Sequence, residues 1–325
     1  MSKTHQELYK HFRDQMFPKL TKLEAARKAL LEKYTLWSIV PAGVIVPFLL
    51  WALSQGFFTN FEGVKTVLIF VAVVVSLYLA AVTWHYRRTD FYRMFKKDVI
   101  EGLVTFISDD VRYEQSGYVT RDRFYASTLY STEAETYEGD DRFLGTIGKT
   151  GFEASELHLA YYVRTKNGRR RVPIFDGLFF IADFNKHMSG ITKVEPDIAE
   201  STFGFLGTSL QKMTAGDRLV KLEDPVFEKL FKVTSTDQVE ARYIITPSMM
   251  QRIVEFKEKA KSQVRLAFLG SSVYIAVSHE GQLFEPNVFA SLLDFAPIRE
   301  YFSDISLALG IIEDLDLNTR IWTKQ

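Results

Sequence analysis

Long apolar stretches lie in the first third of the chain, and mixed polar and apolar patterning follows them. Two stretches with almost no charge cover residues 36–58 and 64–84. A helix of about 20 apolar residues can cross a hydrocarbon core about 30 Å thick. We therefore predict a transmembrane helical hairpin over residues 36–85. Because Pro41 and Pro47 lie in the first stretch, we expect a kink there, and a re-entrant or interfacial segment remains the alternative.

Amphipathic patterns flank the hairpin on both sides. Residues 1–35 carry apolar side chains at three- and four-residue spacings, which predicts an amphipathic helix that Pro18 bends or splits. This helix either packs on the soluble part or forms an interfacial or self-association surface. Residues 86–108 predict a stalk helix that continues the second span, and Asp109 and Asp110 mark its end. The apolar stripe of the stalk consists of Phe91, Phe95, Val99, Leu103 and Phe106.

Charge on the flanks predicts the orientation of the hairpin. Lys and Arg lie before the first span and after the second, whereas the loop at residues 54–64 has Glu62 as its single charged residue. By the positive-inside rule, both termini face the cytoplasm. Tryptophan and basic residues at the ends of the spans are typical of a membrane interface. These membrane-interface candidates are Trp37, Trp51, Trp84, Arg87, Arg88, Lys96 and Lys97.

Residues 109–325 alternate strand-like and helical patterns. Residues 156–164 alternate polar and apolar positions and are followed by Asn167-Gly168, a strong hairpin signal. We expect the return strand over residues 169–175 and further strands over the ranges that follow in the chain. These further strands are predicted over residues 177–184, 190–194, 219–222 and 241–245.

The C-terminal part predicts two helices and a second hairpin. Thr246 and Pro247 are a typical helix start, so we expect a helix through Ser262. Residues 264–268 and 273–278 predict a hairpin, and residues 288–309 a final helical region interrupted before Pro297. The sequence therefore predicts an α+β protein: an N-terminal helix, a two-helix transmembrane hairpin, and a cytoplasmic domain of mainly antiparallel sheet with segregated helices.

Composition narrows the candidate chemistry. Residues 1–97 carry 14 Lys and Arg against 6 Asp and Glu, so the remainder of this neutral chain is acidic and a poor general binder of nucleic acid. The chain has no cysteine, which excludes disulfides, thiol nucleophiles and Cys-ligated metals. Its six histidines are scattered without the spacing of a metal site. We expect no metal or cofactor and no catalytic residue.

Three consecutive arginines, Arg169, Arg170 and Arg171, follow the Asn-Gly turn. Such residues interact favourably with anionic lipid headgroups when a domain is held near a bilayer. The alternative is a charged edge strand that prevents aggregation. Because side chains alternate between faces of a strand, only two of the three arginines can act together.

A second group of charged residues, Asp237, Glu240 and Arg242, lies beside a strand-like run. One interpretation is a polar binding site. The other is a structural ion pair at the entrance of a strand. Both groups are interaction candidates.

Two sequence blocks carry a family resemblance. The first is Phe175–Lys186 (FDGLFFIADFNK), and the second is Leu222–Val233 (LEDPVFEKLFKV), which continues through Asp237–Pro247 (DQVEARYIITP). Together with the double-span N-terminus, these blocks resemble the bacterial membrane-protein family known as domain of unknown function 3137, over about residues 90–295. The resemblance implies the bacterial inner membrane, no established activity, and a LemA-type membrane protein as a partner.

We therefore expect a non-enzymatic interaction, sensor or scaffold protein at the cytoplasmic face of the inner membrane. Its expected partners are the lipid bilayer, a membrane protein and further copies of itself. The alternative is a membrane-associated enzyme or binding protein that acts on a lipid or envelope-related ligand. A buried set of Asp, Glu or His side chains with perturbed pKa values would favour that alternative.

Overall fold

A computed structural model of the chain describes residues 5–32, 47, 74, 81, 88–166, 168–197, 218–279 and 281–317. Apart from three isolated positions, the transmembrane hairpin predicted over residues 36–85 lies outside the described residues. Within the described part of the chain, no helix is both long and apolar enough to cross a membrane.

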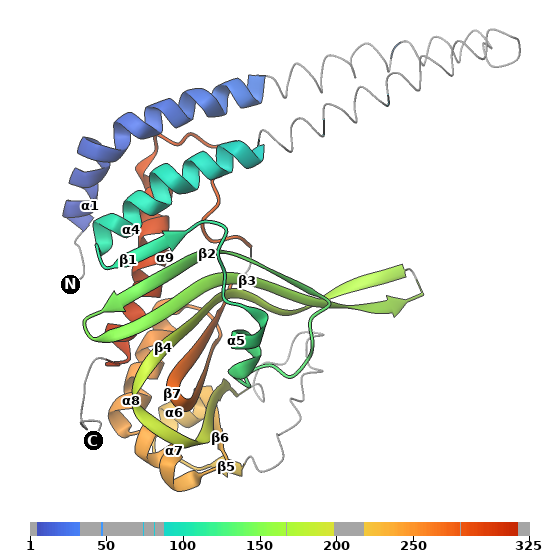
Figure 1. The fold of residues 1–325 in the computed structure, drawn as a ribbon, viewed down its shortest axis with the longest axis vertical. Helices are drawn as coiled ribbons and strands as arrows, with labels where there is room; N and C mark the ends of the chain where they lie inside the picture. The colour runs from blue at the N-terminus through green and yellow to red at the C-terminus, as the bar shows by residue number, and fades with distance from the viewer. Residues whose placement is uncertain are drawn as a thin grey trace, which may run out of the picture. The chain divides into compact units, whose positions relative to one another are not determined.

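The chain divides into two compact units, one made of Thr4–Gly102 with Glu285–Arg299 and the other of Met1–Lys3, Leu103–Phe284 and Glu300–Gln325. The first unit contains α1 (His5–His11) and the π-helical turn η1 (Phe12–Met16), and the helix continues to residue 32 (Figure 1). The wide turn ends two residues before Pro18, and proline has no N–H to continue the α-helical ladder. The buried apolar side chains of this N-terminal helix are Leu8, Phe12, Met16, Leu20, Leu23 and Leu30.

Glu24 and Arg27 form a buried ion pair on this helix. Two guanidinium nitrogens of Arg27 donate to the Glu24 carboxylate, over 2.7 and 2.9 Å. The same two side chains bind the segment Glu285–Arg299: Arg27 donates to the carbonyl of Val288 over 2.9 Å, and the N–H of Leu292 donates to Glu24 over 3.0 Å. The pair therefore fastens a segment far away in sequence onto the N-terminal helix.

The helix predicted as a stalk is described from residue 88 and includes the π-helical turn η3 (Lys96–Ile100) before α4 (Glu101–Ile107). Four residues of its predicted apolar stripe are buried, namely Phe91, Phe95, Val99 and Leu103.

The second unit is built on a seven-stranded antiparallel sheet in the order β1-β2-β3-β4-β6-β5, with β7 also paired to β4. Its strands are β1 (Val111–Glu114), β2 (Thr136–Ile147), β3 (Thr150–Thr165), β4 (Gly168–Pro196), β5 (Arg218–Val220), β6 (Phe231–Ser235) and β7 (Val264–Ser278). Its helices, apart from α4, are α5 (Arg121–Ala126), α6 (Pro225–Leu230), α7 (Gln238–Ile244), α8 (Pro247–Ala260) and α9 (Phe295–Asp314) from Glu300 onward. The α+β class with an antiparallel sheet is confirmed.

Strand β4 organises the sheet, because it pairs with three other strands along its 29 residues. Its first part pairs with β3, its middle with β7, and its end with both β6 and β7. The register to β7 shifts twice, between Asp183 and Met188 and between Met188 and Ile191. These irregularities allow one very long strand to curve through the sheet (Figure 1).

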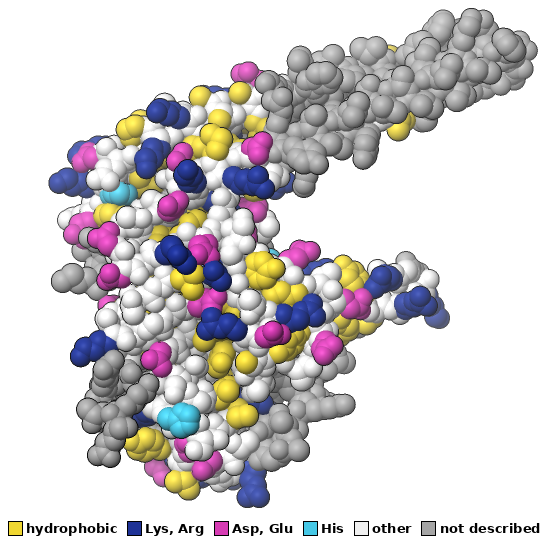
Figure 2. Space-filling view, viewed as in Figure 1, with side chains coloured by type: hydrophobic (Ala, Val, Ile, Leu, Met, Phe, Trp, Pro, Cys, Tyr) yellow, Lys and Arg dark blue, Asp and Glu magenta, His cyan; other side chains and the backbone are white. Residues whose placement is uncertain are grey.

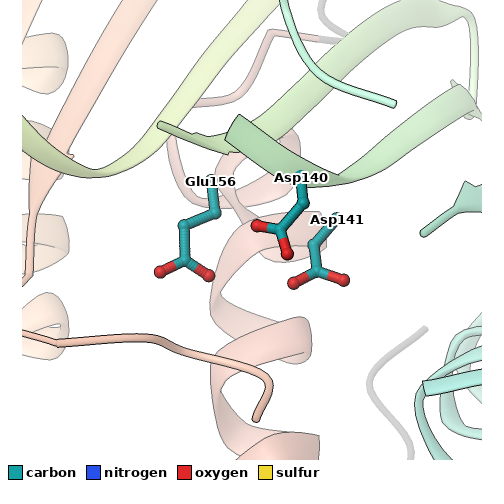
Figure 3. A group of neighbouring side chains, drawn as sticks. All are labelled: Asp140, Asp141 and Glu156. Atoms are coloured by element: carbon teal, nitrogen blue, oxygen red, sulfur yellow. The ribbon is translucent and has the colours of Figure 1, made fainter. Parts of the chain in front are cut away.

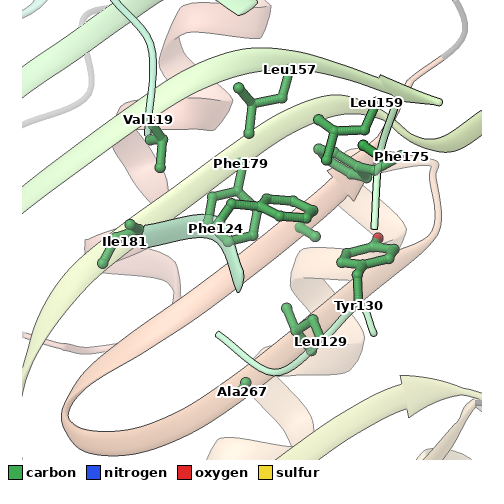
Figure 4. Close-up of a cluster of buried hydrophobic side chains, with 12 residues drawn as sticks. Val119, Phe124, Leu129, Tyr130, Leu157, Leu159, Phe175, Phe179, Ile181 and Ala267 are labelled. Atoms are coloured by element: carbon green, nitrogen blue, oxygen red, sulfur yellow. The ribbon is translucent and has the colours of Figure 1, made fainter. Parts of the chain in front are cut away.

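A buried cluster of apolar side chains covers one face of the sheet. Phe124 from α5 lies against Phe179 of β4, with ring centroids 4.7 Å apart, and is stacked on Tyr130 at 5.2 Å. Leu157 and Leu159 of β3 lie in the same cluster (Figure 4). Aromatic side chains bury large areas, so this cluster is a major source of stability.

The opposite face carries a second set of aromatic contacts. Phe152 and Phe180 stack across β3 and β4 with centroids 5.3 Å apart. Helix α9 runs behind the sheet in Figure 1. Its C-terminal end is held by an ion pair of 2.6 Å between Lys259 and Asp314, and by the Thr150 hydroxyl, which donates to the carbonyl of Leu317 over 3.2 Å.

Three local predictions were wrong. Residues 241–245, predicted as a strand, belong to helix α7, because Asp237 caps the helix by accepting hydrogen bonds from the N–H groups of Val239 and Glu240. Residues 264–278 are one strand, not a hairpin, although Gly270 has φ +59° in its middle. The strands predicted separately over residues 169–194 are all parts of β4.

Candidate functional site

A β-bulge brings carboxylates together on one side of the sheet. The register between β2 and β3 shifts between Asp140 and Phe143, and Asp141 adopts a left-handed backbone with φ +54°. Asp140 lies opposite Glu156 on β3. Figure 3 shows Asp140, Asp141 and Glu156 pointing to the same side, and one carboxylate oxygen from each lies within 4.8 Å of the others.

Two of these carboxylates are fully buried and hold neighbouring segments. Asp141 is 0% exposed and accepts a hydrogen bond from the hydroxyl of Tyr113 on β1. Glu156 is 1% exposed and accepts from the backbone N–H of Leu283 over 3.1 and 3.2 Å. Buried carboxylates need such donors, since burial without them is costly.

His158 extends the cluster along β3. Its Nε2 lies 3.1 Å from Glu156, and its Nδ1 lies 3.1 Å from Asp176, directly opposite on β4. The hydrogen bonds to Asp176 and Glu156 outweigh partial burial and raise the pKa of His158 to about 10. The imidazole is therefore cationic at neutral pH and serves as a counter-charge, not as a general base.

Asp304 of α9 adds a fifth acidic group. Burial, together with repulsion from Glu300 and Glu156, raises the pKa of Asp304 to about 6. This carboxyl group therefore exchanges its proton close to physiological pH. The cluster thus combines a fixed cation, buried carboxylates and one titrating acid.

The carboxylate oxygens of Asp140, Asp141 and Glu156 are ligands that Mg²⁺ and Ca²⁺ prefer. Calcium takes about six to eight oxygens, so three carboxylates would need further ligands such as water. Asp141 and Glu156 also accept hydrogen bonds from Tyr113 and Leu283. A hard cation is therefore the class of metal ion that this group would take, while its visible contacts are structural.

The predicted arginine run lies on β4, close to the β3–β4 turn. Arg169 pairs with Glu135 at 2.7 Å and its guanidinium lies 4.7 Å from the ring centroid of Tyr162. Arg171 pairs with Asp176 at 3.3 Å and so touches the edge of the carboxylate cluster. Arg170 is exposed. The three arginines therefore do not share a single partner.

The second predicted group does not form a common site. Asp237 caps α7, and the Arg242 side chain donates to the carbonyl of Gln238 over 3.4 Å. Glu240 instead binds backbone: its carboxylate accepts from the N–H groups of Ser189 and Gly190, over 2.9 and 2.8 Å. All three residues make structural contacts with the backbone. The predicted ion pair at a strand entrance was wrong.

The membrane-interface candidates are only partly described. Trp37, Trp51, Trp84 and Arg87 lie outside the described residues. Arg88 and Lys97 are exposed, whereas Lys96 is 3% exposed. Arg88 donates to the Tyr92 hydroxyl over 2.8 Å.

Sequence reasoning missed the carboxylate and histidine cluster. Its members come from β2, β3, β4 and α9, so no short motif joins them. The available signal was the presence of acidic residues, such as Asp140-Asp141 and Glu156, within strands, where charge is normally avoided.

Comparison with known proteins supports the family resemblance. Residues 173–317 match the family described as "Protein of unknown function (DUF3137)". The resemblance inferred from the two sequence blocks is thus confirmed over this region.

No curated protein matches the chain. Among solved structures, the mycobacterial trehalose monomycolate transport factor A, TtfA, matches with a TM-score of 0.36 and 10% identity, covering 66% of this chain and 90% of that one. A likeness this low carries no argument about activity.

Proposed function

We propose that this chain is a membrane-anchored, non-enzymatic interaction protein that acts as a sensor or scaffold at the cytoplasmic face of the bacterial inner membrane. The observation that carries the proposal is the pair of apolar stretches at residues 36–58 and 64–84, with basic residues on their outer flanks. The folded unit behind them presents an α+β domain for interaction.

The charge cluster supports a sensor more than a catalyst. His158 is held between two carboxylates and remains protonated at neutral pH, so it does not act as a base. Asp304, in contrast, changes its protonation near pH 6 and lies on α9. A membrane-protein partner of the LemA type and self-association both fit this proposal.

A second candidate is a binding protein or enzyme for a lipid or envelope-related ligand. The observation that favours it is the raised pKa of Asp304 beside Glu156, since perturbed carboxyl groups concentrate at functional sites. The variant Asp304→Asn separates the two candidates. If the cluster is a ligand site, the variant should keep every protein partner. If the cluster is part of a sensor, the variant should change the binding of a protein partner.

The anchor and its orientation can be tested in cells, because the cysteine-free chain accepts single cysteines without background. We expect Glu62→Cys to react with a membrane-impermeant maleimide in intact spheroplasts, and Glu223→Cys to react only after permeabilisation. Release of the protein by alkaline carbonate would contradict the anchor. Labelling of Glu223→Cys in intact spheroplasts would contradict the orientation.

The interaction itself can be tested by crosslinking at native expression, followed by purification in native lipid discs and mass spectrometry. A stoichiometric protein partner would support the scaffold. Recovery of the protein with only a tightly held small molecule would favour the second candidate.

A further inference from the structure

The tip of the β3–β4 hairpin is a concentrated basic surface, referred to below as the basic tip (residues 161–172). It carries Arg164, Lys166, Arg169, Arg170 and Arg171 and contains no acidic residue. One of the five, Arg171, pairs with Asp176 at the base of the hairpin. All five are exposed.

The basic tip projects from the sheet as a two-stranded ribbon. Strand β2 pairs with β3 only as far as Ala160, and β7 pairs with β4 only from Gly177 onward. Among the described pairings, residues 161–172 therefore pair only with each other. Figure 1 shows the ribbon extending beyond the rest of the sheet, and Figure 2 shows basic side chains gathered at its end.

Three of the arginines share one face of this ribbon. Arg164 lies directly opposite Arg169, and Arg171 lies opposite Tyr162, the next position along the same face. Like charges directly opposite each other destabilise a strand pair. Glu135 pairs with Arg169, and Asp176 pairs with Arg171. Among the described residues, no carboxylate pairs with Arg164, so its charge is the one left without a counter-charge on this face.

Protection of strand edges accounts for basic residues in a ribbon, but it does not require two arginines to face one another. An anion placed between the guanidinium groups would remove their repulsion. The guanidinium fork matches the geometry of phosphate oxygens, and the half-buried Tyr162 on the same face supplies an amphipathic ring typical of a bilayer interface.

We infer that the basic tip docks on the anionic headgroups of a lipid bilayer. This inference rests on the proposed anchor, because a chain fixed in a membrane meets its own bilayer at high effective concentration. The tip places three arginines on one face, which suits a surface of many phosphates. Docking brings lipid phosphates to the face that carries Arg164, Arg169 and Arg171 and sets how the domain lies on the membrane.

The test places one fluorophore on the tip of the full chain. Thr165→Cys is exposed, uncharged and unique in the cysteine-free sequence. The labelled chain is reconstituted into vesicles of phosphatidylcholine with or without phosphatidylglycerol, each containing a lipid-attached quencher. We expect phosphatidylglycerol to increase quenching at least about twofold, and added salt to reverse the increase.

Charge variants identify the residues responsible. The triple variant Arg164→Gln, Arg169→Gln and Arg171→Gln should lose the increase. A matched control, Arg218→Gln, Lys229→Gln and Lys232→Gln, removes the same charge from other exposed positions and should retain it. Replacing the three tip arginines with lysine keeps the charge but removes the planar guanidinium groups, and should retain part of the increase in quenching. This result would show that the loss in the Gln variant is not caused by misfolding.

The outcomes separate this inference from the anchor. Flotation with pure phosphatidylcholine vesicles after a carbonate wash tests the anchor alone. If the protein floats but quenching at Thr165→Cys is the same with and without phosphatidylglycerol, the docking inference is wrong and the anchor is still supported. Quenching that persists in the triple Gln variant, or crosslinking of the tip to an acidic protein without lipid quenching, also overturns it.

Discussion

His158 and Asp176 face each other across strands β3 and β4, with Nδ1 of the histidine 3.1 Å from Oδ1 of the aspartate. The same imidazole contacts Glu156, so one cation serves two carboxylates from different positions in the sheet. This arrangement is costly to break, because removing the histidine leaves Glu156, which is 1% exposed, without its counter-charge. The arrangement therefore gives the cluster a definite dependence on pH.

Replacing the histidine should reduce stability in a pH-dependent way. We expect His158→Gln to lower the free energy of unfolding by about 2 kcal/mol at pH 6, after allowance for partial solvent screening. The folded pKa of His158 is about 10 against an ordinary value of 6.5. A raised histidine pKa stabilises the fold fully below the unfolded pKa, and this contribution disappears as pH rises through the folded value.

The measurement is urea unfolding of the detergent-solubilised chain at several pH values. The difference between the wild type and His158→Gln should shrink between pH 6.5 and about 10. Taking this difference removes the effects of other groups that titrate in the same range. A gap that stays constant up to pH 10.5, about half a unit above the folded pKa, would show that the histidine is not held as a cation.

Asp304 should have the opposite effect on stability. Its pKa is raised to about 6, so the fold favours the neutral acid and loses stability as pH rises from about 4 through 6. We expect Asp304→Asn to increase the free energy of unfolding at pH 7.5 by on the order of 1 kcal/mol, since the group is only partly buried.

The control for this variant is Glu258→Gln, an exposed charge on α8 that should change stability by less than about 0.5 kcal/mol. Chemical unfolding at pH 4 and pH 7.5 distinguishes the two cases. At pH 4 the gain from Asp304→Asn should be absent. Equal gains at both pH values would mean that the effect comes from packing instead of charge.

Glu240 is expected to hold the irregular part of β4. Its carboxylate accepts from the N–H groups of Ser189 and Gly190, next to the register shift that ends at Ile191. We expect Glu240→Ala to cost about 1–2 kcal/mol and to increase hydrogen exchange at those two amides. Glu240→Gln keeps an acceptor and should cost less. Unchanged exchange at both amides in Glu240→Ala would contradict this role.

The sequence predicted regular segments well and interruptions poorly. The hairpin expected at Asn167-Gly168 is present, since Thr165 pairs with Gly168 where the strands turn. The break expected at Gly270 is not a turn, because β4 supplies partners for β7 on both sides of that glycine. Local signals cannot distinguish a turn from a bulge when the deciding partner is a strand distant in sequence.

The candidate site was harder to predict for the same reason. Asp237 and Glu240 are close in sequence, yet one caps a helix and the other binds the backbone of β4. Glu156 and Asp304 are distant in sequence, yet the charge of one raises the pKa of the other. Spacing along the chain identifies caps and turns, whereas electrostatic clusters depend on the register of strands and the packing of α9.

Gly177 offers a direct test of how closely β4 and β7 approach. Its φ is +143°, and a Cβ placed there would lie 2.2 Å from the carbonyl oxygen of Val277. Backbone atoms cannot move aside as the end of a flexible side chain can. We therefore expect Gly177→Ala to lower the free energy of unfolding by about 3 kcal/mol or more, as a severe packing defect in a core does. Gly151→Ala is the matched control, because a Cβ there meets no described atom within 4 Å. Thermal unfolding should separate the two variants clearly, and equal stability would show that β4 and β7 tolerate a wider separation at this point.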